Sequence, residues 1–414
     1  MKYKVLNWVN RFSIFCFLDN NRYPSSASSL EVLVAAGAME TISGQAGDML
    51  SAFQKRLDKE SSWWFGHLGY DLKNETETGL SSTLPDEIGF DDLFFFRPRH
   101  IIRLHEQHAE LMTVDDPATI WEEITGLNEA PPAQQGRIPA IQSRLTREEY
   151  IRQIDLLRAH ILRGDCYEIN FCQEFFARQV LLQPLKVYRS LSELSPNPFS
   201  AYYRNEEKYL ICASPERYLR KKGTQLLSQP IKGTSPRYPD DADQDYSSRN
   251  ALMQSAKDRS ENVMVVDLVR NDLSRICLES TVKVDELYGI YTFPQVHQMI
   301  STISGELDPS IDFASIIRAT FPMGSMTGAP KRKVMELIEQ YERTKRGLFS
   351  GAVGYITPDG DFDFNVVIRS LFYNETSGYL SYSVGSGITF YSDPEKEYEE
   401  CLVKAEAIIK VLSA

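Results

Sequence analysis

Residues Gln229–Arg237 read QPIKGTSPR, and the strands of the chain are organised around this run, which holds a single lysine, Lys232. Pro230 restricts its own backbone, and Gly233 allows a tight turn or a close approach to a ligand. Taken alone, a lysine flanked by proline and glycine is typical of a surface turn. A lysine held in a pocket can instead act as a nucleophile. Both interpretations of Lys232 therefore remain open at this point.

The residues before this run predict an antiparallel hairpin. Apolar residues in Tyr209–Gln229 flank a central Lys-Gly turn. With that turn at the centre of the hairpin, Glu216 is expected to pair near Gln229. Lys232 lies three residues beyond Gln229, which is roughly 10 Å of strand. Strict alternation puts the two side chains on opposite faces. A bulge or strand end near Pro230 is therefore required to bring Glu216 and Lys232 together.

Composition indicates a soluble globular protein with a large core. The 414 residues are 42% hydrophobic and 25% charged, and this length allows two or three domains. A net charge of −12 disfavours nucleic-acid binding. An acidic protein that binds an anionic substrate needs local positive charge, from a metal ion or from a few arginines.

Cysteine usage and hydropathy predict a cytoplasmic protein that does not contact a membrane. The six cysteines include no CxxC pair and stand among apolar residues, which is typical of reduced, buried thiols. The aromatic run Phe12–Leu18 is too short to span a membrane and is interpreted as a core strand.

Three regions follow from the pattern. Residues 1–125 alternate short apolar stretches with polar turns and are predicted to form an N-terminal subdomain. Residues 126–143 (GLNEAPPAQQGRIPAIQS) are rich in Pro, Gln and Gly and are predicted to be a linker. Residues 144–414 are predicted to form the catalytic domain. No internal repeat is present, and the mixture of elements predicts an α+β fold with largely antiparallel sheet.

The periodicity of the third region predicts its helices and strands. Thr146 and Glu149 form a capping box that opens a helix, and Pro330 is expected at the first position of another. The predicted helices cover about 147–163, 184–194, 246–266, 313–320, 330–342 and 394–412. The predicted strands, besides the hairpin, cover about 166–177, 350–357, 362–373 and 379–390.

Three further patterns could carry chemistry. Asp258 with Glu261, and Glu397 with Glu400, are carboxylate pairs on predicted helices, and such oxygens suit Mg²⁺. Each pair taken alone favours a solvated helix face. The loop Thr327–Lys331 leads into a helix and offers backbone N–H groups to an anion, or simply caps that helix.

Six segments together resemble the chorismate-utilising enzymes, a family that includes anthranilate, aminodeoxychorismate, isochorismate and salicylate synthases. The segments are SPERY (Ser214–Tyr218), PIKGTSPR (Pro230–Arg237), DRSENVMVVDLVRNDLSRIC (Asp258–Cys277), FPMGSMTGAPK (Phe321–Lys331), GAVGYI with VVIRS (Gly351–Ser370), and VGSGI followed by DPEKEYEECLVKA (Val384–Ala405). They occur in the family's order and cover most of residues 145–414. The resemblance implies a sandwich of two packed, largely antiparallel sheets flanked by helices.

The residue at position 232 separates the branches of this family. Anthranilate synthases usually carry alanine in a PIAGT context, whereas aminodeoxychorismate synthases carry lysine in PIKGT, which this sequence resembles. Water-using isochorismate and salicylate synthases carry a general-base lysine in the strand that here reads CYEINFCQ (Cys166–Gln173). The matching position holds Glu168, which disfavours water activation there. The amine-forming branch is expected to carry glutamine, so Glu168 is a departure.

The resemblance also implies binding roles. Glu261 and Glu400 are implied ligands of Mg²⁺, with Glu397 in its outer shell, and the metal is implied to hold the ring carboxylate of chorismate. Tyr355 and Arg369 are implied to bind the enolpyruvyl carboxylate, for which an arginine fork is suited. The other implied substrate-binding residues are Thr234, Thr327, Gly328, Gly385 and Gly387.

The implied catalytic residues are Glu216, Lys232 and His297. Glu216 is the implied general acid for departure of the C4 hydroxyl, and Lys232 is implied to add at ring carbon C2 before ammonia displaces it, giving 4-amino-4-deoxychorismate. His297 is implied to lie near the ring, or is simply a packed histidine. A free lysine has a pKa of about 10.4, so its amine form requires burial or a nearby cation such as Mg²⁺.

The sequence contains no amidotransferase signature, so the resemblance implies that ammonia comes from a separate glutamine amidotransferase subunit in a heterodimer. The expected function is that of aminodeoxychorismate synthase component I in p-aminobenzoate and folate biosynthesis. Lys232 disfavours the alternative of an anthranilate synthase component I. The retained carboxylates disfavour a catalytically silent partner subunit of the same family.

Overall fold

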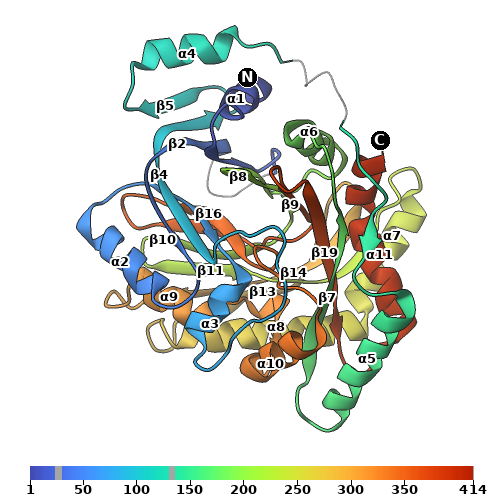
Figure 1. The fold of residues 1–414 in the computed structure, drawn as a ribbon. Helices are drawn as coiled ribbons and strands as arrows, with labels where there is room; N and C mark the ends of the chain where they lie inside the picture. The colour runs from blue at the N-terminus through green and yellow to red at the C-terminus, as the bar shows by residue number, and fades with distance from the viewer. Residues whose placement is uncertain (24–29, 130–135, 414) are drawn as a thin grey trace.

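The computed structural model describes residues 1–23, 30–129 and 136–413 (Figure 1). Its α-helices are α1 (Lys2–Val9), α2 (Met49–Lys59), α3 (Lys73–Thr76), α4 (Pro117–Gly126), α5 (Arg147–Leu162), α6 (Pro184–Leu194), α7 (Ala242–Gln254), α8 (Ala256–Ser274), α9 (Phe313–Thr320), α10 (Lys331–Tyr341) and α11 (Pro394–Ser413). Its strands are β1 (Ile14–Asp19), β2 (Leu30–Gly44), β3 (Trp64–Leu68), β4 (Leu93–His105), β5 (Ala109–Thr113), β6 (Gln142–Ser143), β7 (Glu168–Ala177), β8 (Phe199–Asn205), β9 (Lys208–Ser214), β10 (Arg217–Lys222), β11 (Gln225–Gln229), β12 (Ile231–Pro236), β13 (Lys283–Thr292), β14 (Val296–Glu306), β15 (Gly328–Ala329), β16 (Ala352–Ile356), β17 (Phe362–Asn365), β18 (Ser370–Asn374) and β19 (Tyr379–Ile388).

The strands form two sheets that share the long strands β2 and β4. One sheet runs in the order β7, β19, β18, β9, β8, β1, β2, β4, β5, with the short β6 and β15 paired to β7. The other runs from the first half of β4 through β3, β16, β17, β10 and β11 to β14, which also pairs with β12 and β13. All these strand pairings are antiparallel, as predicted.

Alternation along the strands divides the apolar side chains between two cores. On β1, Cys16 joins the core between the sheets, whereas Phe15 and Phe17 face helices on the outer side. The outer core includes residues of α5 and α11, which lie along β7 and β19 in Figure 1. The α+β sandwich flanked by helices is therefore confirmed.

The hairpin before Lys232 pairs within one residue of the predicted register. Arg217 pairs with Gln229, one residue from the expected partner Glu216. On the next strand, the pairing of β12 with β14 shifts between Ile231 and Thr234, so the backbone is irregular at Lys232. Gly233 adopts a φ of +93° there, a conformation that favours glycine. The required bulge near Pro230 is confirmed.

Two predicted elements are interrupted. The helix expected over 246–266 is two helices, because Ser255 ends α7 and its side chain accepts a hydrogen bond from the Asp258 N–H at the start of α8. The strand expected over 362–373 is broken after Asn365. Its first part pairs with β10 and β16, and its second part pairs with β9 and β19 in the other sheet. The chain therefore crosses between sheets at residues 366–369.

The helix starts and the state of the cysteines can also be compared with the sequence predictions. Pro330 is the N-cap of α10 rather than its first residue, whereas the capping box of Thr146 and Glu149 is present. All six cysteines are free, and five of them are buried. None of the described helices has the length and apolar character needed to cross a membrane.

The first 125 residues share both sheets with the rest of the chain. Strand β1 pairs with β8, and β3 pairs with β16. The division into a subdomain, a linker and a catalytic domain stays a prediction. Residues 130–135 of the predicted linker lie outside the described part of the structure.

Candidate active site

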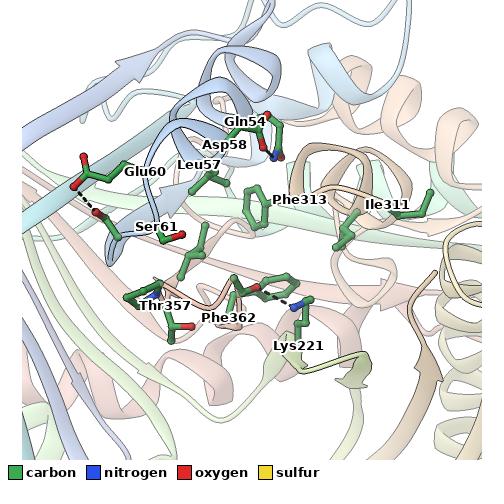
Figure 2. A pocket seen from close by; sticks show the side chains of 15 residues that line it. Gln54, Leu57, Asp58, Glu60, Ser61, Lys221, Ile311, Phe313, Thr357 and Phe362 are labelled. Carbon is green, nitrogen blue, oxygen red and sulfur yellow. Dashed lines mark hydrogen bonds between the residues drawn. The ribbon is translucent and has the colours of Figure 1, made fainter. Parts of the chain in front are cut away.

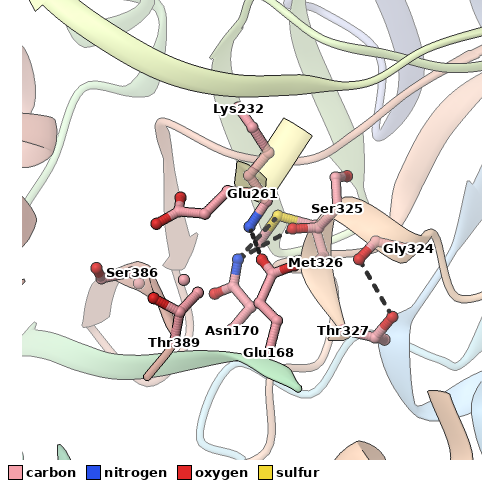
Figure 3. Close-up of polar contacts among 12 residues, drawn as sticks. Glu168, Asn170, Lys232, Glu261, Gly324, Ser325, Met326, Thr327, Ser386 and Thr389 are labelled. Carbon is pink, nitrogen blue, oxygen red and sulfur yellow. Dashed lines mark hydrogen bonds and ion pairs between the residues drawn. The ribbon is translucent and has the colours of Figure 1, made fainter. Parts of the chain in front are cut away.

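Lys232 lies where the two sheets meet. Its Nζ donates a hydrogen bond to Oε1 of Glu168, the first residue of β7, at 2.5 Å (Figure 3). Both residues are buried, with exposed fractions of 8% and 1%. Burial acts to lower the pKa of Lys232, but the carboxylates of Glu168 and Glu261 outweigh it and hold this pKa above its ordinary value. The lysine is therefore an ammonium ion in this state.

A carboxylate group lies beside this pair. Glu261 comes from α8, and Glu397 and Glu400 come from α11. Nζ of Lys257 lies among them, 3.0 Å from Glu397, 3.8 Å from Glu261 and 3.9 Å from Glu400. Burial raises the pKa of Glu261 to about 7, although Lys232 and Lys257 oppose the shift. The ammonium group of Lys257 therefore lies between the three glutamates that were predicted as metal ligands.

The residues of this group fit Mg²⁺. Oε1 of Glu261 is buried and has no hydrogen-bond partner among the described residues, and an orphaned buried carboxylate oxygen is typical of a binding site. Mg²⁺ takes hard oxygen ligands, commonly one or two carboxylates with waters and substrate. The three glutamates are not drawn tightly together: in the described chain, only His105, His108 and Glu110 form a trio of potential ligands whose atoms all lie within 4.8 Å of one another.

Glu216 and Arg369 lie on the connections where the chain crosses between the sheets. Glu216, between β9 and β10, is 3% exposed. Burial raises its pKa to about 7, against the influence of Lys232 and Arg369. Burial lowers the pKa of Arg369 to about 10, and Glu216 opposes this shift. A carboxyl group with a pKa near neutral therefore lies near a guanidinium group, an arrangement that suits general-acid chemistry on an anionic substrate.

Two glycines allow the backbone to approach the Lys232–Glu168 pair. A Cβ on Gly387 would lie 2.9 Å from Nζ of Lys232 and 3.0 Å from Oε1 of Glu168. A Cβ on Gly328, whose φ is +140°, would lie 2.1 Å from the carbonyl oxygen of Glu168. Both glycines predicted at these positions therefore border the pair, and neither position has room for a side chain.

The loop before α10 encloses the start of β7. The Asn170 side chain donates to the Ser325 carbonyl at 3.1 Å, and its backbone N–H donates to the Thr327 carbonyl at 2.8 Å. A Cβ on Gly385 would lie 2.7 Å from Oδ1 of Asn170. Thr327 is fully buried, and its N–H already donates to the Gly324 carbonyl. Thr327 and Gly385 thus lie beside the site, but the Thr327 N–H is engaged within its own loop.

Three predicted residues are not joined to this site by any contact described for them. The Tyr355 ring lies 5.9 Å from the rings of Trp63 and Phe65. His297 uses both ring nitrogens, one with Thr292 and one with Asp245. Thr234 is exposed on β12. Their roles stay predictions.

Sequence reasoning missed several residues of the site. Lys257 bridges the glutamates, and Lys404 pairs with Glu400 at 2.7 Å while donating to the Gly385 carbonyl. The signal was present, since Lys257 precedes Glu261 by four residues and Lys404 follows Glu400 by four. Arg346, in a buried ion pair with Glu342, donates to the carbonyls of Asn170 and Met326 and so fixes the loop.

A separate cavity of about 260 Å³ lies between α2, α9 and the turn after β16 (Figure 2). Its lining combines charged residues such as Asp58 and Lys221 with apolar ones such as Phe313. It contains none of the predicted site residues.

The comparisons with known proteins agree with this geometry. Residues 19–410 match the family described as chorismate binding enzyme. The chain is 38% identical over 271 residues to aminodeoxychorismate synthase component 1 of Escherichia coli (strain K12), covering 66% of this chain and 59% of that protein. It is 34% identical over 358 residues to the protein of the same name from Klebsiella aerogenes, covering 84% and 77%. The solved structure of the menaquinone-specific isochorismate synthase from Escherichia coli superposes with a TM-score of 0.79 at 19% identity, covering 98% of this chain and 91% of that one. The chain belongs to the chorismate binding enzyme family.

Proposed function

We propose that the chain is an aminodeoxychorismate synthase component I, which converts chorismate and ammonia to 4-amino-4-deoxychorismate and water. The observation that carries the proposal is the buried Lys232, held by Glu168 with Glu216 and Arg369 nearby. A water-activating enzyme has no need of a nucleophile at this point. The names of the two curated relatives support the same activity.

The first step moves a proton. The Lys232 ammonium passes a proton to the Glu168 carboxylate, across the 2.5 Å contact, and becomes a neutral amine. The amine then adds to ring carbon C2, the two conjugated ring double bonds both shift toward C4, and the C4–O bond breaks. Glu216, which is partly protonated at neutral pH because burial raises its pKa to about 7, gives its proton to the departing hydroxyl, which leaves as water.

The second step restores the enzyme. Ammonia forms a bond to C4, both ring double bonds shift back, and the bond between C2 and Nζ of Lys232 breaks with its electron pair returning to the nitrogen. The new C4 ammonium gives a proton to the Glu216 carboxylate. Glu168 then returns its proton to Lys232. The sum is chorismate plus ammonia giving aminodeoxychorismate plus water.

Substrate binding requires positive charge in this acidic site. Arg369 donates no side-chain hydrogen bond to any residue in the described ranges, so its fork is available for a carboxylate of chorismate. Glu261 and Glu400, with Glu397 as an outer-shell residue, would hold Mg²⁺, which would supply positive charge for the other carboxylate. In the absence of Mg²⁺, the ammonium group of Lys257 contacts the same glutamates and offsets their negative charge.

The proposal extends to partner, pathway and location. The relatives are named as component 1, which supports a second component, and we assign to it the supply of ammonia as a glutamine amidotransferase subunit in a heterodimer. The product class places the reaction in p-aminobenzoate and folate biosynthesis, in the cytoplasm.

The test uses the purified chain with chorismate, Mg²⁺ and an ammonium salt at alkaline pH, and identifies products by mass before and after addition of a lyase. Aminodeoxychorismate is expected, with its formation abolished in Lys232→Ala and retained in Lys222→Ala, which alters an exposed lysine of the same hairpin. Anthranilate formed without the lyase would contradict the proposal. No consumption of chorismate would favour a catalytically silent subunit.

A further inference from the structure

A second set of side chains with metal-binding chemistry lies on the β4–β5 hairpin, apart from the active site. His105 ends β4, His108 lies in the turn, and Glu110 is the second residue of β5. Their potential ligand atoms all lie within 4.8 Å of one another. Nε2 of each histidine is 3.5 Å from the same oxygen, Oε1 of Glu110.

These separations match the geometry of a tetrahedral zinc site. With Zn–N and Zn–O bonds of about 2.0–2.1 Å, two ligand atoms of a tetrahedron are about 3.3 Å apart. The histidine-to-Glu110 separations of 3.5 Å require only a small adjustment to reach that value. The centroids of the two imidazole rings lie 4.2 Å apart and the rings are nearly parallel, at 6°, so the exposed His108 ring must turn out of this stack before both nitrogens can point at one ion.

The hairpin holds the three residues in place. The His105 N–H donates to the His108 carbonyl at 2.8 Å, which closes the turn, and Leu104 pairs with Ala109 just before it. Arg103 donates to the other oxygen of Glu110, Oε2, at 2.9 Å. This contact fixes the carboxylate and leaves Oε1 directed at the histidines, as outer-shell partners of metal ligands do.

We propose that His105, His108 and Glu110 bind one divalent metal ion of the zinc class, with water in the fourth position. Imidazole nitrogen with a single carboxylate suits Zn²⁺ and its neighbours among the transition metals, whereas Mg²⁺ takes oxygen ligands. The site is therefore chemically distinct from the glutamate group of the active site. It opens to solvent, since the His108 side chain is 59% exposed, and it joins the end of β4 to β5.

The test is a calorimetric titration of the tag-free full chain with Zn²⁺, in excess Mg²⁺ so that the glutamate group is occupied. One equivalent of zinc is expected to bind the parent chain. The affinity for this zinc ion should fall more than about tenfold in His108→Ala. Gln107→Ala, which alters an exposed turn residue that offers no ligand in this trio, is the matched control and should keep the parent affinity.

Two further readouts separate a coordination site from a structural effect. Co²⁺ in place of Zn²⁺ should give the intense visible absorption of a tetrahedral ion in the parent and in Gln107→Ala, and not in His108→Ala. Zn²⁺ should raise the thermal unfolding midpoint of the parent but not of His108→Ala. Failure of the parent to take up zinc, or equal zinc affinity and cobalt spectra in the parent and His108→Ala, would overturn the proposal.

Discussion

Replacement of the buried acid Glu216 by glutamine is expected to stabilise the metal-free chain at alkaline pH. Burial raises the folded-state pKa of Glu216 from its ordinary value of 4.5 to about 7. The folded protein therefore holds this proton more tightly than the unfolded chain does. Stability contributed by this group is lost as pH rises from about 4.5 to about 7, and the loss persists above that range.

The size of the effect follows from the shift. A difference of about 2.5 pH units corresponds to about 3 kcal/mol of free energy of unfolding, at about 1.4 kcal/mol per unit. At pH 8 nearly all of that cost applies, whereas at pH 5 it is about 1 kcal/mol. Glutamine imitates the neutral, protonated acid in shape, so Glu216→Gln should recover these amounts.

The assay is urea unfolding followed by tryptophan fluorescence, at pH 5 and pH 8 with EDTA present. The free energy of unfolding of Glu216→Gln should exceed that of the parent by about 3 kcal/mol at pH 8 and by about 1 kcal/mol at pH 5. Glu122→Gln, which changes an exposed carboxylate on α4, should show no such difference. Equal stabilities at both pH values, or a less stable Glu216→Gln at pH 8, would refute the burial argument.

Three other substitutions test the site. Lys257→Gln should tighten Mg²⁺ binding at least about tenfold in calorimetry without substrate, because it removes a positive charge held within 3.9 Å of all three glutamates; weaker binding would show that Lys257 organises the ligands instead. Gly387→Ala places a methyl group 2.9 Å from Nζ of Lys232, so aminodeoxychorismate formation should fall more than about tenfold and the unfolding midpoint should fall as well; an unchanged rate of formation would show that this contact does not matter for the reaction. Arg369→Lys should raise the KM for chorismate more than about tenfold, since an ammonium group cannot form a bidentate contact; an unchanged KM would exclude Arg369 from substrate binding.

Periodic features of the sequence predicted much of the fold. Alternation around the turn gave the β10–β11 register to within one residue, and Pro230 with Gly233 located the bulge that turns Lys232. The break between β17 and β18 could not be predicted in this way. Residues 366–368 are Val, Val and Ile, and an apolar run buried at a sheet crossing has the same pattern as an uninterrupted strand.

The sequence predicted which side chains lie together where a family motif contains the residue. It did not predict contacts that depend on tertiary packing. Glu216, Lys232 and Glu261 lie together as expected. Lys257 could not be placed among the glutamates from local pattern, because Glu397 lies 140 residues away in the chain. The pairing of Tyr355 with Arg369 was implied by the family resemblance, and it stays a prediction because neither residue has a described contact with the other.

The shared strand β4 joins the two sheets along one line of continuous backbone. Because β4 pairs within both sheets, the sandwich is closed along that line by continuous backbone, and the sheets cannot part there without loss of main-chain pairing. Strands β7 and β12 are far from β4 in the strand order, and the sheets meet there through the side chains of Glu168 and Lys232. The Lys232–Glu168 ion pair is therefore a side-chain link between two sheets that share continuous backbone at β4.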